Sequence, residues 1–163
     1  MSSMTKSSSA GVVHFDASWK SIMECAAVEV FELMAGVRLE LLASPGEPCG
    51  EQTAMVGMAG ALCGMTSVRC SRTTAGKLAA LMLGGDVATN PSMARDALGE
   101  LCNMVAGNFK AKISNLADHC MLSVPTVITG DNYSMDAVPP TEGLTLALVF
   151  EGEPIFVTLI THS

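Results

Sequence analysis

Two apolar runs near the end of the chain place the strongest constraint on its fold. Residues 144–150 and 155–160 are rich in valine, leucine, isoleucine and threonine, which favour strands, and the segment EGEP at 151–154 forms a turn between them. Strands joined by so short a turn pair antiparallel. A glycine-rich segment centred on Gly60 and flanked by apolar residues is typical of a second hairpin. The sequence therefore predicts an antiparallel sheet.

Three other segments have apolar residues at helical spacing. The first covers residues 16–35, and the second covers residues 73–83, where two glycines stop it. The third is a long helix that Ser92 would cap and that runs to about residue 114. A further strand is predicted over residues 120–128. The combination is an α+β fold, in which an antiparallel sheet packs against two long helices.

The length of the chain sets the number of domains. The 163 residues leave room for one domain that can bury a core without disulfides or a structural metal. Hydrophobic residues make up 49% of the chain and charged residues only 15%, which excludes an intrinsically disordered protein. Residues 1–12 are serine-rich and are predicted to form a flexible tail, so residues 13–163 form a single domain.

Charge and hydropathy exclude two classes of partner. The formal net charge is −7, which leaves no basic surface for nucleic acid. The longest apolar run, residues 54–65, is interrupted by three glycines and is too short to cross a bilayer as a helix. The N-terminal segment lacks the apolar region of a secretory signal. We therefore expect a cytoplasmic protein that binds neither nucleic acid nor membrane.

The six cysteines and three histidines form no recognisable metal site. The sequence contains no CxxC and no Cys/His spacing of the kind that binds zinc. Reduced and mostly buried thiols are expected in a cytoplasmic chain. A stand-alone thiol or ligand-binding protein is an alternative, but no cysteine has a neighbourhood that would activate it. We predict no metal and no cofactor of the protein's own.

A polar stripe runs along the third predicted helix. At about 100° per residue, Asp96, Glu100, Asn103 and Gly107 fall within roughly 60° of one another. The opposite side carries the apolar residues Leu98, Leu101, Cys102, Val105 and Phe109. Asparagine is unfavourable inside a helix because its amide competes with backbone hydrogen bonds, so Asn103 indicates a side chain that is used. A solvated polar face without a function is the alternative.

The spacing of these residues resembles a family signature. Asp96-x3-Glu100-x2-Asn103, followed by Pro125, is similar to the signature of the CheC/CheX/FliY phosphatases, in which Asp or Ser precedes ExxN and a proline follows later. The segment NMVAGNFK at 103–110 is also similar to the stretch after ExxN in CheX-like members. The resemblance extends more loosely over residues 15–162. It implies a CheX/CheC-like fold with a pseudo-symmetric internal repeat.

The resemblance implies a protein phosphatase that hydrolyses the aspartyl-phosphate of a CheY-type response regulator, in chemotaxis or a related two-component system. Asn103 would orient the attacking water, and Glu100 would dock on the receiver. Asp96 and Gly107 would support the helix face or its docking, and Pro125 would shape the sheet near the site. The Mg²⁺ ion would belong to the acidic pocket of the receiver. The alternative is a non-catalytic adaptor that docks on a response regulator or a flagellar-switch component.

A faint internal echo links two predicted helices. The segment MECAA at 23–27 lies 76 positions before GELCN at 99–103, and Ala27 stands where the later segment has Asn103. The chain therefore resembles CheX, with one active site per chain, more than CheC, which carries two. The resemblance also implies a homodimer formed through the sheet.

Overall fold

The computed structural model describes residues 13–85, 88–139 and 141–162. In chain order, its elements are α1 (Trp19–Ala35), β1 (Glu40–Leu41), β2 (Gln52–Gly60), β3 (Cys63–Cys70), α2 (Arg72–Met82), α3 (Pro91–Ala111), α4 (Ser114–Ala117), β4 (Cys120–Leu122), β5 (Thr126–Thr129), β6 (Thr141–Phe150) and β7 (Glu153–His162). Both predicted hairpins and all three predicted helices are confirmed. The predicted tail, residues 1–12, lies outside the described residues.

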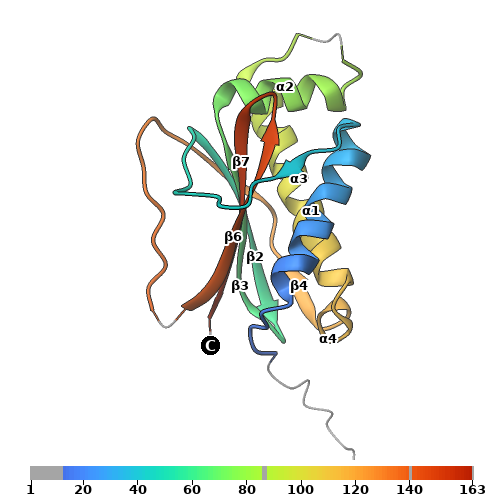
Figure 1. The fold of residues 1–163 in the computed structure, drawn as a ribbon, viewed down its shortest axis with the longest axis vertical. Helices are drawn as coiled ribbons and strands as arrows, with labels where there is room; N and C mark the ends of the chain where they lie inside the picture. Colours follow the sequence, from blue (N-terminus) through green and yellow to red (C-terminus); the bar gives the residue numbers. More distant parts are fainter. Residues whose placement is uncertain (1–12, 86–87, 140, 163) are drawn as a thin grey trace, which may run out of the picture.

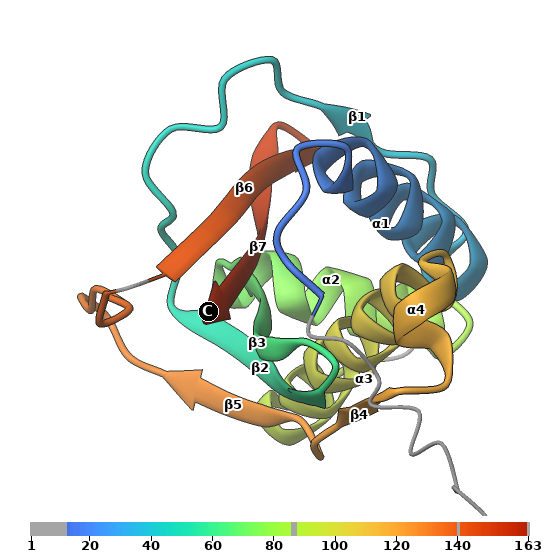
Figure 2. The same cartoon turned by 90° about the horizontal axis from the view of Figure 1, so that it is seen from below.

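The strands form one antiparallel sheet. Their order is β1-β6-β7-β3-β2-β4, and β5 also pairs with β2. The turn between β6 and β7 consists of Glu151 and Gly152, which both have positive φ, as expected for a two-residue hairpin turn. The long helices α1 and α3 cover one face of the sheet, and the loops around residues 42–51 and 130–139 pass over the other face (Figure 1, Figure 2). This arrangement confirms the predicted α+β class.

The buried faces of α1 and α3 form the core together with the sheet. Trp19 of α1 meets Phe109 of α3 edge to face, with 5.7 Å between the ring centroids. The apolar residues predicted for the inner side of α3 are all buried. Each large side chain of this kind contributes about 1.5–3 kcal/mol when it leaves water. The opposite face of α3 is consequently turned away from the core, as the sequence predicts.

The start of α3 differs from the prediction. Asn90, not Ser92, caps the helix, because Asn90 Oδ1 accepts a hydrogen bond from the backbone N–H of Met93 at 2.9 Å. Pro91 takes the first helical position, where a residue without an N–H is tolerated. The helix ends at Ala111 and not at residue 114, and the separate short helix α4 begins at Ser114.

The predicted single strand over residues 120–128 is wrong. It is divided into β4 and β5, both of which pair with β2, and Pro125 lies between them. Proline has no N–H to donate and therefore interrupts the ladder at this point. Close approach of β4 requires Gly60, since a Cβ atom there would lie 2.3 Å from the carbonyl oxygen of His119.

Candidate functional site

The outer face of α3 carries the predicted site residues. Asp96 and Glu100 are exposed, whereas Asn103 and Gly107 are half-buried. Within the described residues, the side chains of Asp96, Glu100 and Asn103 form no hydrogen bond and no ion pair. Glu100 and Asn103 lie about 4.5 Å apart along the helix axis, at 1.5 Å per residue. The face therefore presents a carboxylate and an amide that are both available to a partner.

Asn103 also lines a groove between α1 and α3. The groove has a volume of about 400 Å³ and is lined by Glu29, Val30, Leu33, Asn103, Met104, Gly107, Asn108 and Leu122. Leu33 is 74% exposed and contributes an apolar side chain to the same lining as Asn103. Gly107 keeps its part of the groove open, since a Cβ there would have only Leu122 Cδ1 nearby, at 3.9 Å. The site thus combines polar side chains on the outer face of α3 with a partly apolar groove.

Pro125 lies against the same helix, although it is 22 residues away from Asn103 in the sequence. A Cβ atom added to Gly99 would lie 3.5 Å from Pro125 Cβ and 3.6 Å from Val127 Cγ2. The link between β4 and β5 is therefore packed directly on α3 next to Glu100. Pro125 packs against the helix that carries Glu100 and Asn103, and its ring is half-buried.

A cluster of polar side chains joins α1 to α3 beside the groove, and sequence reasoning did not find it. Asn108 Nδ2 donates to the carbonyl oxygen of Ala26 at 3.2 Å and to Glu29 Oε2 at 2.9 Å, and Lys112 Nζ donates to Glu29 Oε1 at 3.1 Å. The hydrogen bonds from Asn108, Lys112 and Cys25 hold the pKa of Glu29 at about 2. No sequence signal links Glu29 to residues so far along the chain.

The described residues contain no group of three or more His, Cys, Asp or Glu side chains that could hold a metal ion. All six cysteines are free thiols. The expectation of mostly buried thiols is wrong for three of them, since Cys25, Cys49 and Cys63 are exposed. Burial raises the pKa of the Cys102 thiol to about 12, which makes it a poor nucleophile.

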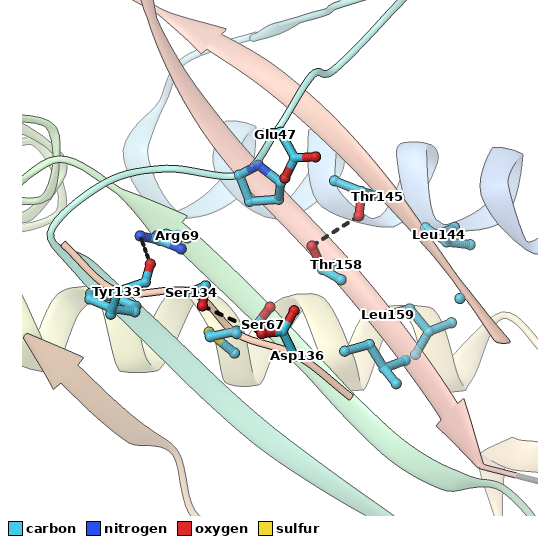
Figure 3. Close-up of a pocket in the computed structure, with 14 residues that line it drawn as sticks. Glu47, Ser67, Arg69, Tyr133, Ser134, Asp136, Leu144, Thr145, Thr158 and Leu159 are labelled. Carbon is cyan, nitrogen blue, oxygen red and sulfur yellow. Dashed lines mark hydrogen bonds between the residues drawn. The ribbon is translucent and has the colours of Figure 1, made fainter. Parts of the chain in front are cut away.

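A second cavity, of about 410 Å³, lies on the face of the sheet away from the helices (Figure 3). The buried Arg69 donates from Nε to the carbonyl oxygen of Gly50 and from Nη2 to that of Tyr133, both at 2.9 Å. Its guanidinium also lies 4.1 Å from the centre of the Tyr133 ring. These contacts tie the two covering loops to the sheet. Because the sheet separates this cavity from α3, neither Glu100 nor Asn103 can contribute to it.

Comparison with known proteins identifies the family. A sequence model of the family described as Chemotaxis phosphatase CheX matches residues 52–148, more than half of the chain. The chain belongs to the CheX family. The matched region contains α3 with Asp96, Glu100 and Asn103, and it includes Pro125.

A curated CheX relative is the CheY-P phosphatase CheX of Thermotoga maritima, which is 34% identical over 77 residues. The match covers 47% of this chain and spans half the length of that relative. The solved CheX structure from Vibrio vulnificus has a TM-score of 0.78 at 18% identity and covers 92% of this chain and 100% of its own. The CheX–CheY–BeF3–Mg²⁺ complex from Borrelia burgdorferi contains a chain with a TM-score of 0.73 at 21% identity, covering 89% of this chain and 98% of its own. These structures confirm the CheX/CheC-like fold.

Among the described helices of this CheX family member, none has the length and apolar character needed to span a membrane.

Proposed function

We propose that this CheX family member hydrolyses the aspartyl-phosphate of a CheY-type response regulator, with Asn103 orienting the attacking water and Glu100 docking on the receiver. The observation that carries the proposal is the outer face of α3. There, an amide without a hydrogen bond to any described residue stands one helical turn from an exposed carboxylate. Family membership and the signature Asp96-x3-Glu100-x2-Asn103 support the same assignment.

The chemistry fits a neutral amide. In-line attack on an acyl phosphate places negative charge on the phosphoryl oxygens, and a carboxylate in the water-binding position would repel them. The Asn103 amide can accept a hydrogen bond from water through Oδ1 without adding charge. Holding the water in line converts a random encounter into an oriented one, which is the main contribution expected from this residue.

The remaining catalytic groups would come from the receiver. In this proposal, the phosphorylated aspartate and the Mg²⁺ ion belong to the receiver's acidic pocket. The phosphatase adds Asn103 and Glu100 to that site. The complex from Borrelia burgdorferi, which contains CheY, BeF3 and Mg²⁺, supports this division of roles. Asp96 and Gly107 would line the contact with the receiver, and Pro125 would hold the helix in place.

The test is phosphate release from a phosphorylated CheY-type receiver with Mg²⁺. We expect wild-type protein to accelerate release and Asn103→Ala to lose about 10²-fold of that acceleration, or roughly 2.7 kcal/mol of transition-state stabilisation. Asn115→Ala on α4 is the matched control, because Asn115 is an exposed asparagine outside the proposed site and should leave turnover unchanged. Equal turnover by wild type and Asn103→Ala would refute the proposed role. A stable complex with an unaltered phosphate lifetime would support the non-catalytic adaptor instead.

Three further properties belong to this proposal. The strand order supports the internal repeat. The strand β1 follows α1 and pairs with β6 of the later hairpin, whereas β4 and β5 follow α3 and pair with β2 of the earlier hairpin. The homodimer through the sheet and the cytoplasmic location rest on family membership. Light scattering of the purified protein would test the dimer, and a monomer at all concentrations would refute it.

A further inference from the structure

The cavity on the face of the sheet away from the helices has a row of hydroxyl groups on its floor (Figure 3). Ser67 of β3 is in register with Thr158 of β7, which is in register with Thr145 of β6. Residues directly opposite each other on antiparallel strands point to the same face, so the three hydroxyls lie side by side. The volume of about 410 Å³ is in the range of small-molecule sites.

Ser67 has a hydroxyl that the fold does not use. Thr145 and Thr158 share a hydrogen bond of 3.3 Å between their Oγ1 atoms. Ser67 is only 4% exposed, and its Oγ forms no hydrogen bond with any described residue. This oxygen is not enclosed, since Gln52 Oε1 is the enclosed side-chain atom without a partner in the described part of the chain. Because Ser67 lines the cavity, its O–H opens into the cavity and can donate to a ligand.

Arg69 brings a buried positive charge to the same strand. It is 8% exposed; Nε and Nη2 donate to the carbonyl oxygens of Gly50 and Tyr133, whereas Nη1 donates to no described residue. Arg69 also takes part in none of the ion pairs found between residues 13 and 162 where the structure describes them. Neutral carbonyl groups do not cancel a charge, and a buried charge is costly unless an anion pairs with it. The cavity therefore offers a charge and N–H donors to an anion.

The cavity becomes apolar away from Arg69. Arg69 is in register with Phe156 of β7, whereas Ile160 lies four residues further along that strand, or about 13 Å. Ile160 lines the cavity and points to the same face as the hydroxyl row, since it is two residues from Thr158. A ligand that matches this wall has an anionic group at one end and a short apolar chain at the other.

Two exposed carboxylates restrict the charge of such a ligand. Glu47 and Asp136 belong to the loops that cover this face, and both occur in the lining. Asp136 Oδ2 accepts a hydrogen bond from Ser134 Oγ at 3.4 Å. A ligand with a second negative charge would be repelled by these two carboxylates. The lining therefore favours a single negative charge on the ligand.

We propose that this cavity binds a small monocarboxylate with a short apolar chain. The carboxylate is bound by the guanidinium of Arg69 and the hydroxyl of Ser67, and the apolar chain packs on Ile160. Arginine is suited to this task because its N–H donors match the geometry of a carboxylate. The site lies on the opposite face of the sheet from Asn103 and does not rest on the proposed phosphatase activity.

The first experiment is a titration of the full chain with sodium 4-methylpentanoate, in the absence of any receiver. The backbone N–H resonances of Ser67 and Thr158 are followed by NMR. We expect a saturable shift, and we expect 4-methylpentanamide, which has the same shape without the charge, to bind about tenfold more weakly. The absence of a saturable shift with the acid overturns the site. Equal affinities for the acid and the amide overturn the role of the buried charge.

The second experiment repeats the titration with variants of the two binding residues. We expect Arg69→Gln to raise the Kd for the acid about tenfold, whereas Arg38→Gln, which changes an exposed arginine outside the lining, leaves it unchanged. Arg69 also ties two loops to the sheet, so thermal unfolding verifies that its variant is folded.

Ser67→Ala keeps the contacts of Arg69 and decides the matter even if Arg69→Gln does not fold. We expect it to raise the Kd about threefold, and Ser21→Ala on the exposed face of α1 is its matched control. Wild-type affinity in Ser67→Ala, or in a folded Arg69→Gln protein, overturns the proposed position of the carboxylate.

Discussion

The helices α1 and α3 lie on the same face of the sheet, but their polar side chains have different roles. Glu29 of α1 is held by Asn108 and Lys112, so its carboxylate is used within the fold. Glu100 and Asn103 of α3 have no such partners among the described residues. A polar residue on a helix is therefore available to a partner only when the fold does not already use it.

The two helices also differ at the positions that the internal echo aligns. Ala27 is completely buried, whereas Asn103 is half-buried and lines a groove. The structure therefore gives the position of Ala27 no access to a partner. An asparagine there would face the core and not the surface.

Ala27→Asn tests this difference with the largest expected effect on stability. We expect the free energy of unfolding to fall by about 2–4 kcal/mol, because the larger side chain overpacks the core and buries an amide without a partner. Urea unfolding measures the change. Ala111→Asn, at the exposed end of α3, is the control and should cost less than about 1 kcal/mol. A stable Ala27→Asn protein with doubled turnover per chain would reveal a second site on α1. It would contradict the difference between the positions of Ala27 and Asn103.

Asn108→Ala tests the clamp, which is the cluster of Glu29, Asn108 and Lys112 that joins α1 to α3. Because the variant removes two hydrogen bonds from Asn108 to α1, we expect a loss of about 1–2 kcal/mol in the free energy of unfolding. Asn115→Ala should stay within about 0.5 kcal/mol of wild type, as expected for an exposed position. Equal stability of Asn108→Ala and wild type would mean that the clamp contributes nothing to the fold.

The titration of Glu29 gives an independent measure of the same clamp. The hydrogen bond from Asn108 is the main cause that holds the pKa of Glu29 at about 2, below its ordinary value of 4.5. A lowered pKa in the folded state stabilises the protein above pH 4.5, and this contribution is lost as the pH falls towards 2. We expect Asn108→Ala to raise the pKa of Glu29 towards 4.5, measured by NMR of the carboxyl carbon. An unchanged pKa in that variant would exclude Asn108 as the cause.

Substitutions of two glycines of α3 should have the smallest effects on stability, and only one of them should affect binding. Gly99→Ala and Gly107→Ala should each stabilise the helix by up to about 1 kcal/mol, since the nearest atoms to an added Cβ lie at 3.5 and 3.9 Å. Only Gly107 lines the groove, so only Gly107→Ala should weaken binding of the receiver, measured as a higher Kd. If both variants bind the receiver as wild type does, Gly107 is a tolerated small residue without a docking role.

Patterns that are local in the sequence determined most of the architecture. The apolar runs at 144–150 and 155–160 predicted the hairpin of β6 and β7, because the period of a strand and the length of a turn depend on neighbouring residues. The apolar face of α3 follows from helical spacing in the same way, and it correctly predicted that Glu100 and Asn103 point away from the core.

Contacts between distant parts of the chain were decided only by the tertiary structure. Glu29 contacts Asn108 although 79 residues separate them. Gly99 of α3 packs beside Pro125, which lies in the break between β4 and β5. Gln52 and Arg95 line one cavity although they belong to β2 and α3. Spacing along one helix or strand carries no information about which other element will pack on it. The sequence alone therefore determined the face on which the proposed site residues lie, and packing determined which polar groups remain free to bind a partner.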